Sequence, residues 1–211
     1  MLVRHKKFAL FLLMFTSYTM LSGMVCGRAL NFTIQVLNPF QQTVEMPKIL
    51  AEAGIKESNG KIPDGVDKTI TYRTKTVDLD LDNHEKTKAI FTEYGSKIHS
   101  IYVNRIHLDV DTNTFEYDLS RIQVEVAPFG SKTFELIGSF NELPAEVSKT
   151  SSMFLWEPKG QERIHEIMAT HKIQIRFVVS FRVKGGDPYP KGNKGILKLS
   201  MPTELVFVFS P

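Results

Sequence analysis

Between residues 171 and 183 the chain alternates apolar and polar side chains at every second position. The apolar positions are Ile173, Ile175, Phe177, Val179, Phe181 and Val183, and most positions between them hold Lys, Gln, Arg or Ser. Successive side chains of a β-strand point to opposite sides of the sheet, so this pattern predicts a strand with one buried and one wet face. We predict that it is a central strand of an antiparallel sheet.

The same alternation recurs along most of the chain, which predicts a mainly β fold. The runs 97–111 and 117–127 flank the turn Asp111-Thr112-Asn113-Thr114, so we predict that they form a β-hairpin. In the last run, 205–209, Val206 and Val208 lie on the face opposite Phe207, and both faces are apolar. Such a strand is internal, or it docks against a partner. Further strands are predicted at 30–36, 69–82, 133–137 and 195–201.

Helix signals are fewer. Asn83 is a candidate N-cap for a helix over 84–94 that ends at Gly95, and a second helix after Pro158 spaces Ile164, Ile167 and Met168 on one apolar face. Glycine and proline punctuate residues 38–68, which predicts a loop-rich excursion with a short helix near 48–53. These patterns predict an antiparallel immunoglobulin-like β-sandwich with one or two short helices, formed by a single domain over 26–211.

The first 25 residues have the pattern of a secretory signal. Arg4, Lys6 and Lys7 make the start basic, and an apolar run follows from Phe8 to Val25. A basic start, an apolar stretch and small residues after it are typical of an export signal rather than of a spanning helix. We therefore expect an exported protein of the bacterial cell envelope, or a secreted one.

Three outcomes stay open at the end of this leader. Cys26, the only cysteine, stands where a bacterial lipoprotein signal places its acylated residue, and an acyl chain there tethers a domain to a membrane. Met24 and Val25 are larger than the residues that usually precede such a cysteine, and a conventional cut after Gly27 or Ala29 also fits. The apolar run is also just long enough for an uncleaved anchor. In the first and third outcomes, the membrane is a partner through an N-terminal lipid or signal anchor.

The charge of the chain depends on this leader. The 26 lysines and arginines exceed the 23 acidic residues, but removal of Arg4, Lys6 and Lys7 leaves equal numbers. Nucleic-acid binding needs a basic stripe, so we expect no nucleic-acid partner. Because no cysteine lies outside the leader, the domain has no internal disulfide, and its stability comes from packing, as in many bacterial envelope proteins.

Two short acidic runs are the candidates for a metal site. Asp78, Asp80 and Asp82 share one face of a predicted strand, and Asp109 and Asp111 form the second run. Neither run fits an EF-hand loop, because the positions that require Gly and Glu hold other residues. A looser calcium site where the two runs meet is one hypothesis, and a solvated strand face is the alternative.

An aromatic cluster and the last strand supply candidate partner contacts. The segment Met153-Phe154-Leu155-Trp156 contains the only tryptophan. Phe154, Trp156, Val206 and Val208 are candidate contacts with a partner, although burial under a loop is the more common arrangement for such a cluster.

The chain carries no recognised catalytic motif. None of the histidines outside the leader stands in a recognised spacing with a nucleophile or an acid; they are His84, His99, His107, His165 and His171. Paired carboxylates could come from Glu142, Glu146, Glu162 and Glu166 only if the fold brought them together. We therefore expect no catalytic residue, no enzymatic activity and no cofactor.

A short leader with a cysteine, followed by alternating strands, resembles the organisation of bacterial envelope lipoproteins with immunoglobulin-like sandwiches. This organisation implies a non-catalytic domain, tethered or free, whose strand edges or loops contact another envelope protein. The alternative is a carrier that holds a lipid or another apolar ligand inside a sandwich or barrel, with which the 15 phenylalanines are compatible. A hydrolase of envelope polymers is a third class, and only the unassigned carboxylates favour it.

Overall fold

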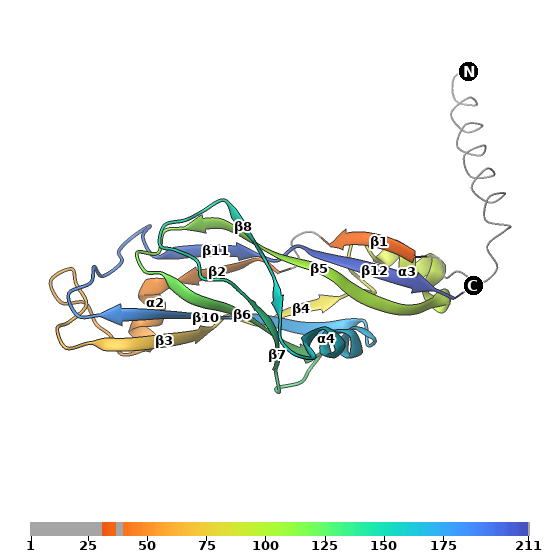
Figure 1. Ribbon diagram of the computed structural model, residues 1–211, viewed down its shortest axis with the longest axis horizontal. Helices are drawn as coiled ribbons and strands as arrows, with labels where there is room; N and C mark the ends of the chain where they lie inside the picture. The colour runs from red at the N-terminus through yellow and green to blue at the C-terminus, as the bar shows by residue number, and fades with distance from the viewer. Residues whose placement is uncertain (1–30, 37–39, 211) are drawn as a thin grey trace, which may run out of the picture.

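The computed structural model of the chain describes residues 31–36 and 40–210, and the predicted leader with Cys26 lies outside them. The fold is mainly β. Two antiparallel sheets enclose a shared hydrophobic core along an elongated body (Figure 1), an arrangement consistent with a β-sandwich.

One sheet is organised around its longest strand, β5 (Ile98–Asn113), in the strand order β1-β12-β5-β11-β2. Its other members are β1 (Asn31–Val36), β2 (Gln42–Glu45), β8 (Thr150–Met153), β11 (Ile196–Ser200) and β12 (Thr203–Phe209). The first part of β5 pairs with β12, and its last part pairs with β11 on the same edge and with β8 on the opposite edge. Pro202 separates β11 from β12, because proline has no N–H group to donate to a ladder.

The other sheet is organised around β10 (Lys172–Lys184), in the strand order β3-β10-β6-β7-β9. Its other members are β3 (Asp67–Arg73), β4 (Val77–Asp80), β6 (Leu119–Pro128), β7 (Glu135–Phe140) and β9 (Leu155–Trp156). β10 pairs with β6 on one edge and with β3 and β4 on the other. Its odd-numbered side chains from 173 to 183 are at most 2% exposed, which confirms the predicted central strand with one buried face.

The predicted strand 69–82 is divided into β3 and β4. Between them the chain leaves the ladder at Thr74, which is buried. The N–H of Phe177 donates to the Thr74 hydroxyl at 3.0 Å, and the N–H of Thr74 donates to the Phe177 carbonyl at 2.9 Å. The threonine side chain thus satisfies a backbone group of β10 that a continuous strand would have bonded.

The predicted hairpin of 97–111 with 117–127 is wrong, because β5 and β6 belong to different sheets. The connection between them carries Phe115 and Tyr117, whose side chains are buried between the sheets. The hydroxyl of Tyr117 donates to the Pro188 carbonyl in the loop after β10. Residues that bury their side chains in this way form an arch from one sheet to the other, whereas a hairpin loop exposes its tip to water.

A second crossing closes one side of the sandwich. β8 pairs with β5 in the first sheet, and β9, which follows after Phe154 alone, pairs with β7 in the second (Figure 1). Phe154 at the corner packs against Phe140, with 5.1 Å between the ring centroids. Gly138 of β7 makes room for this ring, since a Cβ atom there would lie 2.6 Å from Phe154 Cε1.

Three α-helices lie in the described part of the chain, where one or two were predicted. They are α2 (Met46–Glu52), α3 (Lys88–Tyr94), which a 3₁₀ turn η1 (Gly95–Lys97) follows, and α4 (Gly160–Met168). α4 confirms the predicted apolar face, because Ile164, Ile167 and Met168 are buried.

Of the other two helices, α2 confirms the short helix predicted near 48–53, and α3 corrects its prediction. α3 is shorter than predicted and begins after Thr87 instead of Asn83, because the hydroxyl of the buried Thr87 is bonded to the Leu81 carbonyl and fixes the chain there. From residue 40 to residue 68, the chain forms β2 and the start of β3 in addition to the short helix, which is α2. Met46, Ile49 and Leu50 of α2 enter the core, and this burial holds the helix in place.

Candidate functional site

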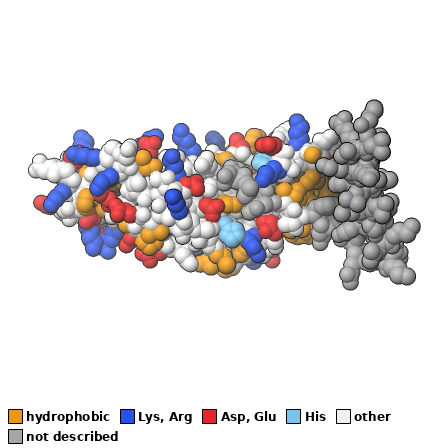
Figure 2. Space-filling model, turned by 90° about the horizontal axis from the view of Figure 1, so that it is seen from above, with side chains coloured by type: hydrophobic (Ala, Val, Ile, Leu, Met, Phe, Trp, Pro, Cys, Tyr) orange, Lys and Arg blue, Asp and Glu red, His pale blue; other side chains and the backbone are white. Residues whose placement is uncertain are grey.

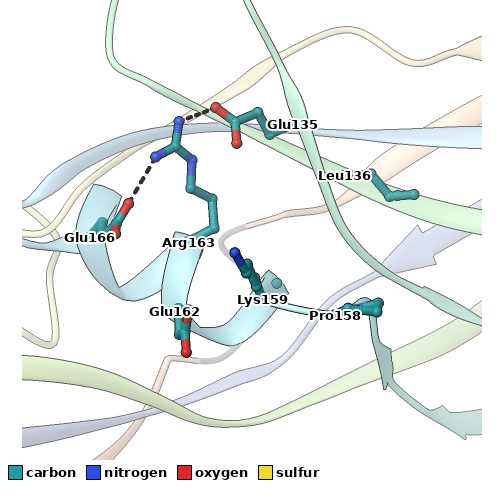
Figure 3. A pocket seen from close by; sticks show the side chains of 8 residues that line it. Glu135, Leu136, Pro158, Lys159, Glu162, Arg163 and Glu166 are labelled. Carbon is teal, nitrogen blue, oxygen red and sulfur yellow. Dashed lines mark hydrogen bonds and ion pairs between the residues drawn. The ribbon is translucent and has the colours of Figure 1, made fainter.

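A shallow surface groove of about 560 Å³ lies between β7 and the start of α4 (Figure 3). β7 contributes Glu135 and Leu136, the turn before the helix contributes Pro158 and Lys159, and the helix contributes the rest of the lining: Gly160, Glu162, Arg163 and Glu166. The groove thus combines five charged side chains with a short apolar wall.

The turn into α4 is set by close backbone contact. Lys159 has a left-handed backbone with φ 67°, and at Gly160 a Cβ atom would lie 2.8 Å from the Ile137 carbonyl carbon of β7. Only glycine permits such an approach without a shift of one backbone. The first turn of α4 is therefore held against β7, and this contact fixes the side chains that line the groove.

Arg163 is held between two carboxylates. Its guanidinium donates to Glu166 Oε2 at 2.8 Å and to Glu135 on β7, as the dashed lines in Figure 3 show. The hydrogen bonds that Arg163 donates, first to Glu135 and then to Glu166, raise the pKa of Arg163 above its ordinary value. Glu135 and Glu166 thereby share one cation, whereas Lys159 and Glu162 form no ion pair within the described chain.

The opposite side of α4 is tied to the other sheet. His165 Nδ1 lies 2.8 Å from the Ile101 carbonyl oxygen of β5, and because a carbonyl only accepts, Nδ1 carries the proton. The imidazole also stacks on the Tyr102 ring, with 4.3 Å between centroids and 3° between planes. α4 therefore bridges β5 and β7, on the same side of the sandwich that β8 and β9 close.

Exposed apolar side chains gather along this side. Met153 is 70% exposed and Leu155 is 50% exposed, because they flank the inward-pointing Phe154. The β7–β9 register sets Ser139 opposite Leu155. Beyond this pair the Glu157 N–H donates to the Ile137 carbonyl, and the next residues, Pro158 and Leu136, both line the groove. We call this surface, formed by Leu136, Met153, Leu155 and Pro158, the crossover edge.

The residues proposed from sequence as partner contacts lie elsewhere. Phe154 is only 6% exposed and belongs to the core, and Trp156 is half-buried with its ring 4.7 Å from that of Phe154. Val206 and Val208 are half-buried on β12, which is hydrogen-bonded to β1 and to β5 and is therefore internal, as predicted. Met153 and Leu155 belong to the same proposed segment but were not named as contacts, although their alternation with Phe154 places them on the outward side.

The two acidic runs are not brought together. Asp78 accepts from the Gln174 amide, Asp80 pairs with Lys172 at 2.9 Å, and Asp82 lies 3.0 Å from His171 Nδ1. Each aspartate of β4 and the turn after it thus has a partner on or beside β10, while Asp109 and Asp111 lie on β5 in the other sheet. Among the described residues, no group of three acidic, histidine or cysteine side chains is arranged to hold a metal ion.

The outer face of the second sheet carries a charged cluster around Glu125 that no sequence pattern indicated. Glu125 on β6 accepts from Arg176 Nε at 2.7 Å and lies 3.5 Å from Arg73 Nε on β3. The Arg176 guanidinium also covers the Phe134 ring at 3.9 Å. These contacts join three strands across the outer face of the sheet, so the cluster has a structural role.

No protein-family model matches this chain, and no curated protein matches its sequence. Within residues 31–36 and 40–210, no helix has the length and hydrophobicity that crossing a bilayer requires.

Proposed function

We propose that this protein is a non-catalytic, exported interaction module of the bacterial envelope that binds a protein partner along the crossover edge. The immunoglobulin-like type of the sandwich, the signal segment and the anchoring of the chain at Cys26 are parts of the same proposal. β1 begins at Asn31, only a few residues after Cys26. A lipid at that cysteine would therefore place the β1 end of the fold beside the membrane.

The crossover edge carries this proposal. A soluble surface usually scatters its apolar side chains singly, and exposed apolar side chains that gather beside charged groups are typical of a docking site. Met153 and Leu155 lie on the same side of the chain, and charged side chains of the groove surround Leu136 and Pro158. Over the face displayed in Figure 2, basic and acidic side chains are interspersed, which favours a protein partner over a nucleic acid.

The filled interior favours an interaction module over a carrier. The Phe115 and Phe181 rings lie 6.2 Å apart, and Phe140, Phe177 and Phe207 are also buried. An apolar ligand would have to displace these rings. A hydrolase is disfavoured by the groove, because Arg163 pairs with Glu135 and Glu166 and leaves Glu162 as the only carboxylate there without an ion pair within the described chain.

Site-specific photo-crosslinking tests the docking surface. The full chain is produced in bacterial cells with a benzophenone amino acid at Met153 or Leu155, and Phe129, a similarly exposed apolar residue on the turn after β6, is the matched control. We expect discrete protein adducts from the two edge positions and none of the same size from Phe129. Adducts absent from both edge positions, or identical at all three, contradict the proposal.

Intact-mass measurement of the same protein tests the export route. An acylated N-terminal Cys26, a new terminus after Gly27 or Ala29, or an uncut chain each agree with one of the three leader outcomes. A full-length chain recovered from the cytoplasm contradicts export.

A further inference from the structure

The groove carries two unpaired charges of opposite sign. Lys159 and Glu162 both line it, neither forms an ion pair within the described chain, and in Figure 3 their side chains point apart. They stand three residues apart at the start of α4, next to the apolar end of the crossover edge. All the other charged side chains of the groove are engaged with one another through Arg163.

Such an arrangement is self-complementary under a two-fold rotation. An axis that passes between Lys159 and Glu162 exchanges their positions, so each lysine of one copy meets the glutamate of the other, and two equivalent contacts form. The same rotation covers the exposed Leu136 and Pro158 with their counterparts. Surface ion pairs contribute little affinity but fix the register, while the apolar residues supply the attraction.

We propose that the partner of the crossover edge is a second copy of this chain, docked by a two-fold contact in which Lys159 of each copy pairs with Glu162 of the other. This inference rests on the proposed function, because it names the partner of that surface. A two-fold contact uses the same patch on both copies, and a patch that holds a cation and an anion without ion pairs in the described chain fits itself.

Charge reversal tests the pairing. The full chain is expressed with its own leader and purified in mild detergent, with whatever cleavage or acylation the cell has made. Its association is measured by sedimentation velocity over a range of concentrations. We expect a concentration-dependent dimer, at least about tenfold weaker in Lys159→Glu and in Glu162→Lys, because each variant sets like charges against each other twice. The double variant restores the pairs with reversed polarity and should return to within about threefold of the original affinity.

A mixture of Lys159→Glu with Glu162→Lys is the most discriminating test of the pairing. One copy then offers two acids and the other two bases at these positions, so a heterodimer should form although each variant alone associates poorly. This rescue also shows that both variants are folded. A chain that is monomeric at about 100 μM, near-original dimerisation of either single variant, or no recovery in the double variant and the mixture overturns the inference.

The crosslinking described above separates failure of this inference from failure of the proposed function. An adduct of twice the chain mass from Met153 agrees with a second copy. Adducts with other proteins from a chain that stays monomeric refute the second copy and leave the docking surface in place.

Discussion

The corner at Phe154 can be tested by adding a single methyl group at Gly138. In Gly138→Ala the new Cβ atom would overlap the Phe154 ring, which approaches to 2.6 Å at Cε1, and the Leu155 carbonyl oxygen of the crossing segment. The ring can turn aside only by giving up its contact with Phe140. The carbonyl belongs to the β9 backbone, so the strand itself has to move.

The size of the effect follows from two opposing terms. Overpacking of a buried site costs about 1–3 kcal/mol, and the stiffer alanine in the unfolded chain returns about 0.4–1 kcal/mol. Because a backbone atom is among the clashing groups, we expect a net loss of about 1.5–2 kcal/mol of unfolding free energy. For a domain of this size, that loss corresponds to a fall of about 4–6 °C in the thermal midpoint.

Urea unfolding followed by tryptophan fluorescence measures this loss, because Trp156 lies beside the affected ring. Gly95→Ala is the matched control: a Cβ atom there meets no atom within 4 Å, and φ is −53°. We expect the control to stay within about 0.5 kcal/mol of the original protein. Combining Gly138→Ala with Phe154→Leu should cost less than the sum of the two changes. A Gly138→Ala variant as stable as the control would refute the packing of Phe154 on Gly138.

Three further outcomes are expected. Glu125→Gln leaves Arg176, which is 22% exposed, without its carboxylate and should cost about 1–3 kcal/mol in urea unfolding, whereas Glu116→Gln, whose partner Lys194 is largely exposed, should cost less. Asn83 and Lys172 lower the pKa of Asp80, so its contribution to stability is present above the unfolded value of about 3.9 and is lost as the pH falls below it. The thermal midpoint should therefore fall less steeply in Asp80→Asn between about pH 5 and about pH 2. Calcium at about 1 mM should leave the midpoint unchanged, and a rise would show that an acidic run binds it.

The periodicity of apolar residues predicted which face of β10 and of α4 is buried. The alternation from Ile173 to Val183 identified the buried face of β10, because a strand between two neighbours at the core repeats its environment every second residue. The apolar spacing after Pro158 likewise identified the face that α4 buries. Both patterns depend only on local geometry, so they are visible without knowledge of the fold.

Which strands pair with one another could not be predicted from this local periodicity. β5 and β6 are consecutive and both alternate, which favours a hairpin, yet the arch through Phe115 and Tyr117 separates them into two sheets. The available signal was a pair of aromatic residues beside the supposed turn, since Phe115 follows it directly and Tyr117 begins the predicted second strand, whereas a hairpin tip exposes its side chains. The placement of the two acidic runs was equally hidden in the sequence, because the strands that hold them lie in different sheets.

The crossing of the chain at Phe154 also limits how a partner can bind. An extended peptide joins a sheet through a long free strand edge, but β8 and β9 span only Thr150–Met153 and Leu155–Trp156, and Phe154 bends the chain inward between them. α4 covers the neighbouring part of β5, where His165 already occupies the Ile101 carbonyl. Within the described residues, these contacts shorten the edge that another strand could pair with. The recognition that we propose at the crossover edge would therefore depend on side chains, so substitutions at the neighbouring Lys159 and Glu162 are the changes that can distinguish one partner from another.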